Sequence, residues 1–430
     1  MLSKEENELI TRAGPGTPMG NLMRRYWIPA LLTEEIPTPD SPPVQVRILG
    51  EELVAFRDTN GRIGLLDEHC HHRGTSLFYG RNEECGLRCV YHGWKYDVEG
   101  HVVDTPAEPA GSRFKEKLRH PAYPTHEVAG IIFAYLGPRE RMPLFPNYDW
   151  TQVPTDHTYV TKAYQSCNYL QGLEGECDSS HLSFLHRTFS RDGDQSLYQS
   201  DSAPAYETEE ADFGMRLIAT RKAGPGKRYV RVSAQIMPVG VAVPVGTRDA
   251  SGNLDGYEVH FYTPIDDTHS WRFDFGFRRS RVVTDADVHR RLVIGPDYRR
   301  IPNADNHYLQ DREMQRAVNF TGMTDFLTHD SCATESMGPL FDRSREHLGA
   351  SDKGVIAVRR YLLDAIKALQ DGREPPHLVR DFERNDFRHA NATYGVIEDD
   401  GSDWHGHFPH MALTAEDLTA ERGLAEQRAG

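Results

Sequence analysis

Apolar residues form short runs in the first third of the chain, and residues typical of tight turns separate these runs. Gly50-Glu51 and Asn60-Gly61 are two such turns, and each lies between stretches rich in Val, Ile and Leu. The pattern predicts strands at residues 44–49, 53–57, 63–66 and 130–136. These strands indicate an all-β domain over residues 44–138, preceded by an N-terminal arm over residues 1–43.

The remaining residues, 139–430, mix strand-like and helix-like periodicities. Two pairs of apolar runs, 215–221 with 229–237 and 257–263 with 271–277, predict antiparallel hairpins. Helices are expected at residues 168–186, 325–337 and 355–369. In the last helix the apolar residues share one face: Val355, Val358, Leu362, Ile366 and Leu369. The predicted fold class is α+β, in which the β domain precedes a domain of helices packed on an antiparallel sheet, in a helix-grip-like arrangement.

Composition narrows the classes of function. The net charge is −15 and no basic stripe interleaves with aromatic residues, so a nucleic-acid partner is not expected. The longest apolar stretch, 128–136, is too short to cross a membrane, and the acidic N-terminus has no signal-peptide core. Six cysteines in 430 residues do not make a disulfide framework, so the expected location is a reducing cytoplasm without membrane association.

Two short cysteine–histidine motifs carry the first candidate chemistry. Cys70 and His72 form C-x-H, and sixteen residues later Cys89 and His92 form C-x-x-H. Two thiolates and two imidazoles suit a Rieske-type [2Fe-2S] cluster, in which one iron takes two sulfurs and the other takes two histidines. A glycine follows each motif, which lets backbone N–H groups approach the sulfurs. Such a cluster would transfer electrons one at a time.

A zinc site is the alternative interpretation of these four residues. Zinc ribbons prefer C-x-x-C pairs and C-x-H is uncommon among them, so the spacing favours the iron–sulfur cluster. Cys85 lies four residues before Cys89 and could compete as a ligand. We interpret Cys85 as a packing residue.

A polar stripe follows one face of the helix expected at residues 168–186. Its members lie three or four residues apart: Asn168, Gln171, Glu174, Asp178 and His181. The stretch has no lysine or arginine before Arg187, which argues against a solvated face. His186 would lie about 140° from His181 on an ideal helix, so the helix must end or bulge if both bind one metal. Two histidines and a carboxylate form the facial triad of non-haem Fe(II) oxygenases; this motif is weak alone and strong after a cluster motif.

These motifs together resemble the Rieske non-haem iron oxygenases, specifically the terminal oxygenase component of the phthalate dioxygenase-like group. The resemblance covers most of the chain and includes the cluster loops, residues 168–186, and further group markers at 14–20, 24–27, 334–339 and 345–349. It implies a [2Fe-2S] cluster and a mononuclear Fe(II) as cofactors. The implied ligands are Cys70, His72, Cys89 and His92 for the cluster, with His181 and His186 for the iron.

The resemblance also implies the third ligand of the mononuclear iron. In the family this ligand is an aspartate on a later helix, just before a V/T-x-E stretch. The matching residue is Asp330, and Asp325 and Asp342 are fallback candidates. Glu174 departs from the family pattern, because some members place an asparagine facing the iron at this position.

A second aspartate is implied to act between subunits. Asp178 precedes the first iron histidine by three residues, as a bridging aspartate does in the family. By this resemblance Asp178 connects His181 with the partner subunit's His92. Such a bridge requires a homo-oligomer, either a trimer or a hexamer of stacked trimers.

The implied activity is oxygenation of a small aromatic compound with O2 and with electrons from an NAD(P)H-dependent reductase. A phthalate-like aromatic carboxylate is the expected substrate and cis-dihydroxylation the expected reaction. A Rieske monooxygenase or an aryl-ether O-demethylase acting on an aromatic acid is the alternative, and an electron carrier without oxygenase activity is a more distant one. A carboxylate substrate needs a cation, and four arginines on expected strands could supply it: Arg216, Arg221, Arg231 and Arg272.

Overall fold

The computed structural model describes residues 1–109, 111–189, 195–245, 254–288 and 293–408. The chain forms two compact units. One contains Met1–Thr11, Leu144–Tyr262 and Thr268–Gly430, and the other contains Arg12–Pro143 and Thr263–Asp267. The domain limits expected at residues 43 and 138 remain predictions.

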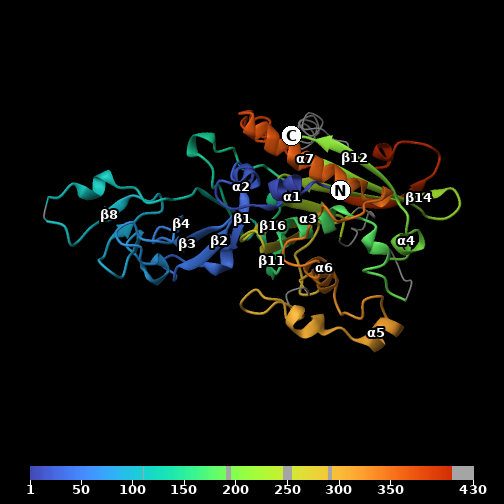
Figure 1. The fold of residues 1–430 in the computed structure, drawn as a ribbon, viewed down its shortest axis with the longest axis horizontal. Helices are drawn as coiled ribbons and strands as arrows, with labels where there is room; N and C mark the ends of the chain where they lie inside the picture. The colour runs from blue at the N-terminus through green and yellow to red at the C-terminus, as the bar shows by residue number, and fades with distance from the viewer. Residues whose placement is uncertain (110, 190–194, 246–253, 289–292, 409–430) are drawn as a thin grey trace, which may run out of the picture. The chain divides into compact units, whose positions relative to one another are not determined.

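The smaller unit, shown mostly in blue and cyan in Figure 1, is built from small antiparallel sheets. Its helix α2 (Pro18–Met23) starts at Thr17, whose side chain caps the Gly20 N–H. One sheet has the strand order β1 (Ile28–Leu32), β10 (Ile131–Ala134) and β9 (Thr125–Val128). A second sheet has the order β2 (Val44–Ile48), β3 (Glu51–Arg57) and β4 (Ile63–Asp67). A third has the order β5 (Arg81–Glu83), β6 (Gly86–Arg88), β7 (Lys95–Tyr96) and β8 (Val102–Asp104).

An apolar core joins the second and third of these sheets. Val54 and Phe56 of β3 pack in it with Leu87 of β6 and Tyr96 of β7, and all four are fully buried. The strands expected from the turn pattern near residues 50 and 60 are therefore present, and their alternating side chains form this core.

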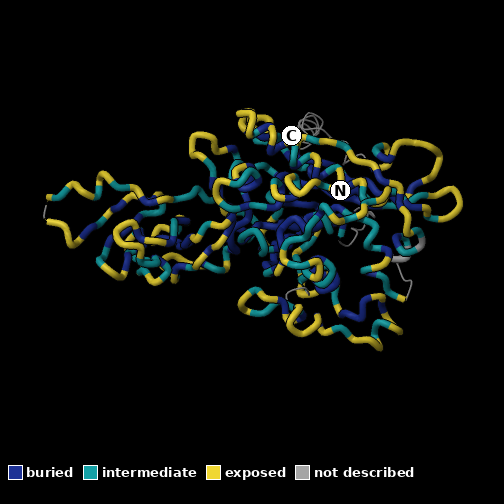
Figure 2. Tube along the Cα trace, in the orientation of Figure 1, coloured by how far each residue is buried: buried dark blue, intermediate teal, exposed yellow. Residues whose placement is uncertain are grey.

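The larger unit is organised around one long antiparallel sheet. Its strand order is β11 (Thr158–Gln165), β17 (Ser270–Phe277), β16 (Glu258–Pro264), β15 (Gly240–Val243), β14 (Lys227–Ile236), β13 (Gly214–Lys222) and β12 (Ala205–Ala211). Strand β18 (Thr393–Glu398) also pairs with β14. The inner strands are almost wholly buried, as Figure 2 shows in dark blue. Both expected hairpin pairs are adjacent strands of this sheet.

Helices pack against this sheet and against one another. They are α1 (Lys4–Thr11), α3 (Tyr169–Cys177), α4 (Gln195–Ser200), α5 (Arg312–Ala317), α6 (Phe326–Glu335) and α7 (Lys353–Gln370). The apolar face of α7 is buried as expected, and α7 lies alongside β12 (Figure 1). Helix α3 contacts α1, α6 and α7. A Cβ atom on Gly172 would lie 2.0 Å from the Tyr262 ring, so only glycine permits α3 to lie this close to β16.

The helix expected at residues 168–186 is shorter in the structure. Helix α3 ends at Cys177, and Asp178 is its C-cap in an extended conformation. A separate 3-10 turn, η7 (His181–Ser183), follows. The expected single face from Asn168 to His181 is therefore wrong beyond Cys177. The helix does end, which was one of the two arrangements expected, an end or a bulge, if both histidines bind one metal. The break frees His181 and His186 to turn toward one another, which one straight helix would prevent.

The predicted α+β fold class, with a β domain followed by an antiparallel sheet with packed helices, is confirmed. Within the described residues, none of the helices combines the length and apolar character needed to cross a membrane.

Candidate metal centres

The two cysteine–histidine motifs form two loops of the same design. In each loop the cysteine N–H donates to the carbonyl five residues later, and the N–H of a glycine donates back to the cysteine carbonyl. These glycines, Gly74 and Gly93, have φ angles of +74° and +73°. An L side chain is strained at such angles, so the glycine after each motif is required by the turn. The loops thus present Cys70 and Cys89 in matching conformations.

The loops bury their sulfurs and leave their imidazoles near the surface. Cys70 and Cys89 are 2% and 3% exposed, whereas His72 is exposed and His92 is half-buried. The rings of His72 and His92 lie 4.5 Å apart between centroids. Trp94 stacks on His72 at 4.7 Å with an interplanar angle of 3°, which fixes that ring. Two thiols and two imidazoles are therefore gathered in one place.

Burial and hydrogen bonding act on the sulfurs in opposite directions. Burial raises the pKa of the Cys89 thiol above its ordinary value and the neighbouring Cys70 adds to this, whereas backbone hydrogen bonds at Tyr91 and His92 offset part of the rise. The Tyr96 hydroxyl lies 3.0 Å from the Cys70 sulfur. Hydrogen bonds of this kind stabilise negative charge on a metal-bound sulfur. The four residues therefore fit a [2Fe-2S] cluster.

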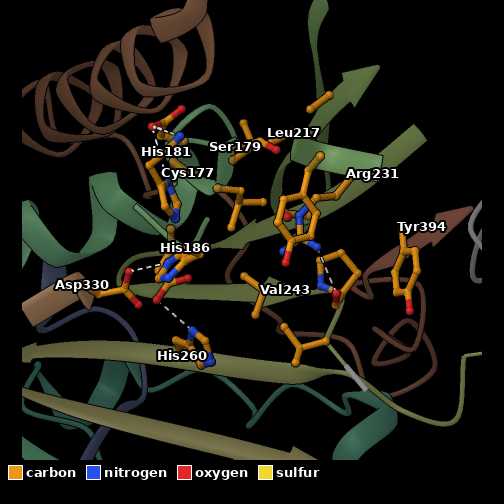
Figure 3. Close-up of a pocket in the computed structure, with 18 of the residues that line it drawn as sticks. Cys177, Ser179, His181, His186, Leu217, Arg231, Val243, His260, Asp330 and Tyr394 are labelled. Atoms are coloured by element: carbon orange, nitrogen blue, oxygen red, sulfur yellow. Dashed lines mark hydrogen bonds and ion pairs between the residues drawn. The ribbon is translucent and has the colours of Figure 1, made fainter. Parts of the chain in front are cut away.

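Three side chains from different elements converge in the larger unit. His181 lies in η7, His186 in the loop after it, and Asp330 on α6. One possible ligand atom from each lies within 4.8 Å of the others. His186 Nε2 is 2.9 Å from Asp330 Oδ1, and two ligands bound at about 2.1 Å to one octahedral metal lie roughly 3 Å apart. Figure 3 shows the three side chains pointing toward one another.

The loop that carries His181 is held by Asp178. One carboxylate oxygen of Asp178 accepts the Ser180 N–H at 2.6 Å, and the other accepts the His181 N–H at 3.1 Å. The Tyr206 hydroxyl also donates to Asp178, at 3.2 Å. Burial raises the pKa of Asp178, but the His181 ring and the backbone N–H groups of Ser180 and His181 lower it below its ordinary value. Asp178 is therefore an anion whose second oxygen lies 3.5 Å from His181 Nδ1.

Arg221 clamps the same loop from the sheet. This fully buried arginine of β13 donates to the Ser179 hydroxyl at 3.1 Å and to the Ser179 carbonyl at 2.6 Å. On the other side of the site, His186 stacks on Phe326 with ring centroids 4.3 Å apart. Its Nδ1 atom lies 3.1 Å from Nδ1 of His329.

A buried charge cluster extends from Asp330 into the sheet. We define it as Glu176, Glu258, His260, Arg272, Asp274 and Asp330. Arg272 links three of its carboxylates, with contacts of 2.7 Å to Asp274, 3.1 Å to Glu176 and 3.6 Å to Asp330. His260 lies between Glu176 at 2.8 Å and Glu258 at 3.1 Å. Only Asp330 and Arg272 of this cluster were expected from the sequence. The sequence pattern that could have revealed the cluster is the placement of charged residues at alternate positions of two expected neighbouring strands.

The charges of this cluster fit a divalent cation. Burial lowers the pKa of His260, but the charges of Glu176 and Asp274 raise it to about 9, so His260 is a cation at neutral pH. Burial raises the pKa of Asp330, but His186 and then Arg272 lower it well below its ordinary range. Asp330 is therefore an anion placed between His186 and Arg272. Together with the two histidines it offers a donor set that suits Fe(II).

The other sequence-based candidates lie elsewhere. Asp325 caps α6 and pairs with Arg300 at 3.0 Å. Asp342 accepts hydrogen bonds from Ser344. Cys85 lies at the turn between β5 and β6, where the Asn60 side chain donates to its sulfur at 3.2 Å. Asp330 is thus the aspartate that the structure brings to the two histidines.

A cavity of about 410 Å³ opens beside the three convergent residues. Its wall includes apolar and aromatic side chains from the sheet and from α6: Tyr198, Tyr206, Leu217, Tyr229, Val243, Phe326, Leu327 and Tyr394. Figure 3 shows the three candidate ligands on one side of the view and Arg231 with Tyr394 on the other. This volume lies in the range of pockets that bind small organic molecules, which is about 300–1,000 Å³.

Comparison with known families agrees with both centres. The Rieske [2Fe-2S] domain matches residues 26–124, and the family described as LigXa C-terminal domain like matches residues 134–422. The oxygenase subunit of phthalate 4,5-dioxygenase from Pseudomonas putida is 39% identical over 86% of this chain and 88% of its own length. The chain belongs to the Rieske oxygenases.

Other relatives of this Rieske oxygenase span several reactions. The oxygenase subunit of 3-chlorobenzoate-3,4-dioxygenase from Comamonas testosteroni is 35% identical over 87% of this chain and 91% of its own length. The oxygenase subunit of 5,5'-dehydrodivanillate O-demethylase from a Sphingobium strain is 31% identical over 89% of this chain and 84% of its own length. Membership makes the chain a non-haem iron oxygenase with a [2Fe-2S] cluster and a mononuclear iron.

Solved structures support the fold of this Rieske oxygenase. Dicamba monooxygenase bound to dicamba matches with a TM-score of 0.59 and 18% identity, over 82% of this chain and 99% of that one. NdmA of Pseudomonas putida CBB5, as a QL mutant with caffeine, matches with a TM-score of 0.61 and 19% identity, over 88% of this chain and 98% of that one.

Proposed function

We propose that this chain is the terminal oxygenase of a multicomponent system and acts on a small aromatic carboxylate. cis-Dihydroxylation of a phthalate-like ring is the reaction we favour. The observation that carries the proposal is the convergence of His181, His186 and Asp330 beside a cavity of about 410 Å³ with a largely apolar and aromatic wall. The names of two relatives, a phthalate and a 3-chlorobenzoate dioxygenase subunit, support the substrate class.

The proposal assigns each centre to its residues. His181, His186 and Asp330 hold the mononuclear iron, supported by the distances among their donor atoms. The [2Fe-2S] cluster is held by the four residues of the two matching loops: Cys70, His72, Cys89 and His92. When bound, the cluster supplies one-electron transfer and the iron supplies dioxygen activation.

The chain itself prepares the iron site for substrate. Asp178 and Arg221 fix the backbone around Ser179 and His181, so the loop is held before substrate binds. Arg272 contacts the Asp330 oxygen at 3.6 Å and orients that carboxylate. Apolar and aromatic residues of the cavity wall would exclude water from around a bound ring.

A subunit bridge through Asp178 belongs to the same proposal. Asp178 would accept a hydrogen bond from His181 in its own chain and one from the partner subunit's His92. In support, Asp178 is an anion already placed against His181, and His92 is only half-buried in its own chain. We therefore propose a homo-oligomer, either a trimer or a hexamer of stacked trimers, as the working form.

The proposal includes an electron donor and a location. Its relatives are named as oxygenase subunits, which supports a separate NAD(P)H-dependent reductase as the partner. We propose the cytoplasm as the location, because the six cysteines are free thiols and the cluster needs reduced Cys70 and Cys89.

Product analysis tests the proposal. The purified chain, a compatible reductase, NADH and ¹⁸O₂ are incubated with phthalate, 3-chlorobenzoate and a methoxylated benzoate. We expect a cis-dihydrodiol that carries two labelled oxygen atoms. A product with one labelled atom, or loss of the methyl group, would replace dioxygenation by monooxygenation or demethylation. A cluster that is reduced by the reductase without forming product from any compound would indicate an electron carrier instead.

A further inference from the structure

Arg231 stands on the wall of the cavity, in the middle of β14. Side chains alternate along a strand, so Arg231 shares its face with Tyr229 and Ser233, and all three line the cavity. Across the sheet, Arg231 lies opposite Ala219 of β13 and Tyr394 of β18. Both of these neighbours also line the cavity. The sheet therefore directs the Arg231 side chain into the cavity.

The described contacts of Arg231 leave its charge uncompensated. Its guanidinium donates one hydrogen bond, from Nη1 to the Pro244 carbonyl at 3.0 Å, and it is half-buried. Among the described residues no carboxylate forms an ion pair with it. Arg272, the other arginine in the cavity wall, differs because it contacts three carboxylates of the buried charge cluster.

The carboxylates of the cavity wall have other partners. Glu176 pairs with His260 and Arg272, Asp178 with His181, and Asp330 with His186. None of them is paired with Arg231 in the described part of the chain. A guanidinium has five N–H donors, so with one used for Pro244 the others remain available to a ligand.

A second guanidinium strengthens the positive potential near Arg231. Arg221 lies on the neighbouring strand, and its pKa is lowered mainly by burial, with the charge of Arg231 among the smaller causes. Two neighbouring cations favour an anion beside them. Arg231 is half-buried next to tyrosines and apolar side chains. An anion would stabilise its charge there better than the single carbonyl does.

We propose that Arg231 binds the carboxylate of the substrate and so selects aromatic acids over neutral aromatic compounds. This inference rests on the proposed oxygenase function and names the group that would recognise its substrate class. The planar guanidinium can hold both carboxylate oxygens at once, whereas a carboxamide of the same shape offers only one oxygen and no charge. Arg231 lies toward the side of the view opposite the candidate ligands in Figure 3, so an acid held there can extend its ring toward them.

The charge of the substrate differs among relatives of this chain. Relatives at similar identity are named for an acid and for a neutral alcohol: 3-chlorobenzoate-3,4-dioxygenase at 35% and tert-butanol monooxygenase / tert-amyl alcohol desaturase at 34%. Family membership alone therefore does not give the charge of the substrate. The four strand arginines were equal candidates in the sequence. Among the described residues, Arg231 is the one of the four that lines the cavity and forms no ion pair with a carboxylate.

Binding measurements on three variants test the inference. Arg231→Met removes the charge, and Arg231→Lys keeps the charge but removes the planar fork. Arg228→Met is the matched control. Arg228 lies three residues earlier on β14, on the opposite face, and contacts Asp399 and Ser402 rather than the cavity. Titration calorimetry compares benzoate, 3-chlorobenzoate and phthalate with 3-chlorobenzamide, and does not depend on turnover.

We expect the wild-type chain to bind at least one acid, and to bind 3-chlorobenzoate more tightly than the amide. Arg231→Met should weaken binding of the acid by about 10- to 100-fold, since charged hydrogen bonds are among the stronger ones. It should leave binding of the amide nearly unchanged. Arg231→Lys should bind the acid with an affinity between those of the wild type and Arg231→Met, and Arg228→Met should bind it like the wild type. In turnover assays, KM for the acid should rise more than kcat falls.

Other results would overturn the inference. The inference fails if Arg231→Met binds the acid as tightly as the wild type does. It also fails if the substitution weakens binding of acid and amide equally, or if the wild type binds none of the acids. Oxygenation of only neutral compounds would refute the role of Arg231 and leave the oxygenase function intact. Binding of acids through Arg231 without any oxygenated product would instead refute the oxygenase function and keep the anion site.

Discussion

Replacing Glu174 by glutamine should destabilise the larger unit. Glu174 lies on α3 with its side chain 12% exposed, and it holds two buried arginines. Arg343, whose side chain is 0% exposed, donates from Nε at 2.8 Å and from Nη2 at 2.9 Å, and Arg359 of α7 donates at 2.6 Å. In the sequence, Glu174 was the departure from the family pattern. In the structure the Glu174 carboxylate faces these arginines, so its charge stabilises the contact between α3 and α7.

The size of the effect follows from what each arginine retains. Arg359 keeps a second carboxylate, Glu346, whereas the remaining described partners of Arg343 are the neutral Asn7 side chain and the Phe341 carbonyl. Glu174→Gln therefore leaves one fully buried guanidinium without a carboxylate. Breaking a buried ion pair in this way costs about 3 kcal/mol or more, roughly 150-fold in the unfolding equilibrium.

Urea unfolding with two optical probes measures this loss. Tryptophan fluorescence reports mainly on the larger unit, which contains three of the five tryptophans, Trp150, Trp271 and Trp404. The visible spectrum of the cluster follows the smaller unit, which contains the other two. We expect Glu174→Gln to lower the fluorescence midpoint. Glu313→Gln is the control, because Glu313 pairs with Arg316 on the exposed surface of α5, where such pairs contribute little.

A second substitution makes the reasoning refutable. Arg343→Met in the Glu174→Gln background removes the unpaired guanidinium, and it should recover part of the lost stability. Either of two results would show that the pair does not stabilise the fold. One is an unchanged urea midpoint for Glu174→Gln. The other is that Arg343→Met lowers the stability by the same amount in the Glu174→Gln background as in the wild type.

Three further predictions concern the iron site and the charges behind it. Asp178→Asn should keep a reducible cluster but lower turnover at least tenfold, since outer partners of metal ligands typically contribute that much; undiminished turnover would exclude the bridging role. His181→Ala should contain one iron atom fewer per chain with an unchanged visible spectrum of the cluster, and a full iron content would remove His181 from the ligand set. The pKa of His260 is raised to about 9, although burial alone would lower it, because Glu176 and Asp274 face it. The resulting stability is complete below about pH 6.5 and is lost as the pH rises to 9, so the free energy of unfolding should fall by up to about 3 kcal/mol over this interval. The measurement compares unfolding of the wild type and of His260→Gln. A chelator first removes the mononuclear iron, because a bound cation would oppose the charge on His260. Only the wild type should show this fall in the free energy of unfolding. Equal slopes in both would refute it.

The sequence by itself determined the features that depend on neighbours along the chain. The cluster loops are encoded locally, because in each loop a glycine four residues after the cysteine closes the turn. The strands around residues 50 and 60 follow from turn residues between apolar runs, and α7 follows from its apolar face. The sequence also required the helix to end or bulge if His181 and His186 bind one metal, since one straight helix cannot direct both to the same point.

Only the tertiary structure decided which distant residues meet. It brought Asp330, the aspartate expected from the resemblance, to His181 and His186, and it ended α3 at Cys177. Alternation along a strand predicts that two residues share a face, but it does not say whether that face meets solvent, a cavity or a charge. For this reason Arg272 and Arg231 were equivalent in the sequence. Packing placed one among three carboxylates and left the other facing the cavity, where an anion can reach it.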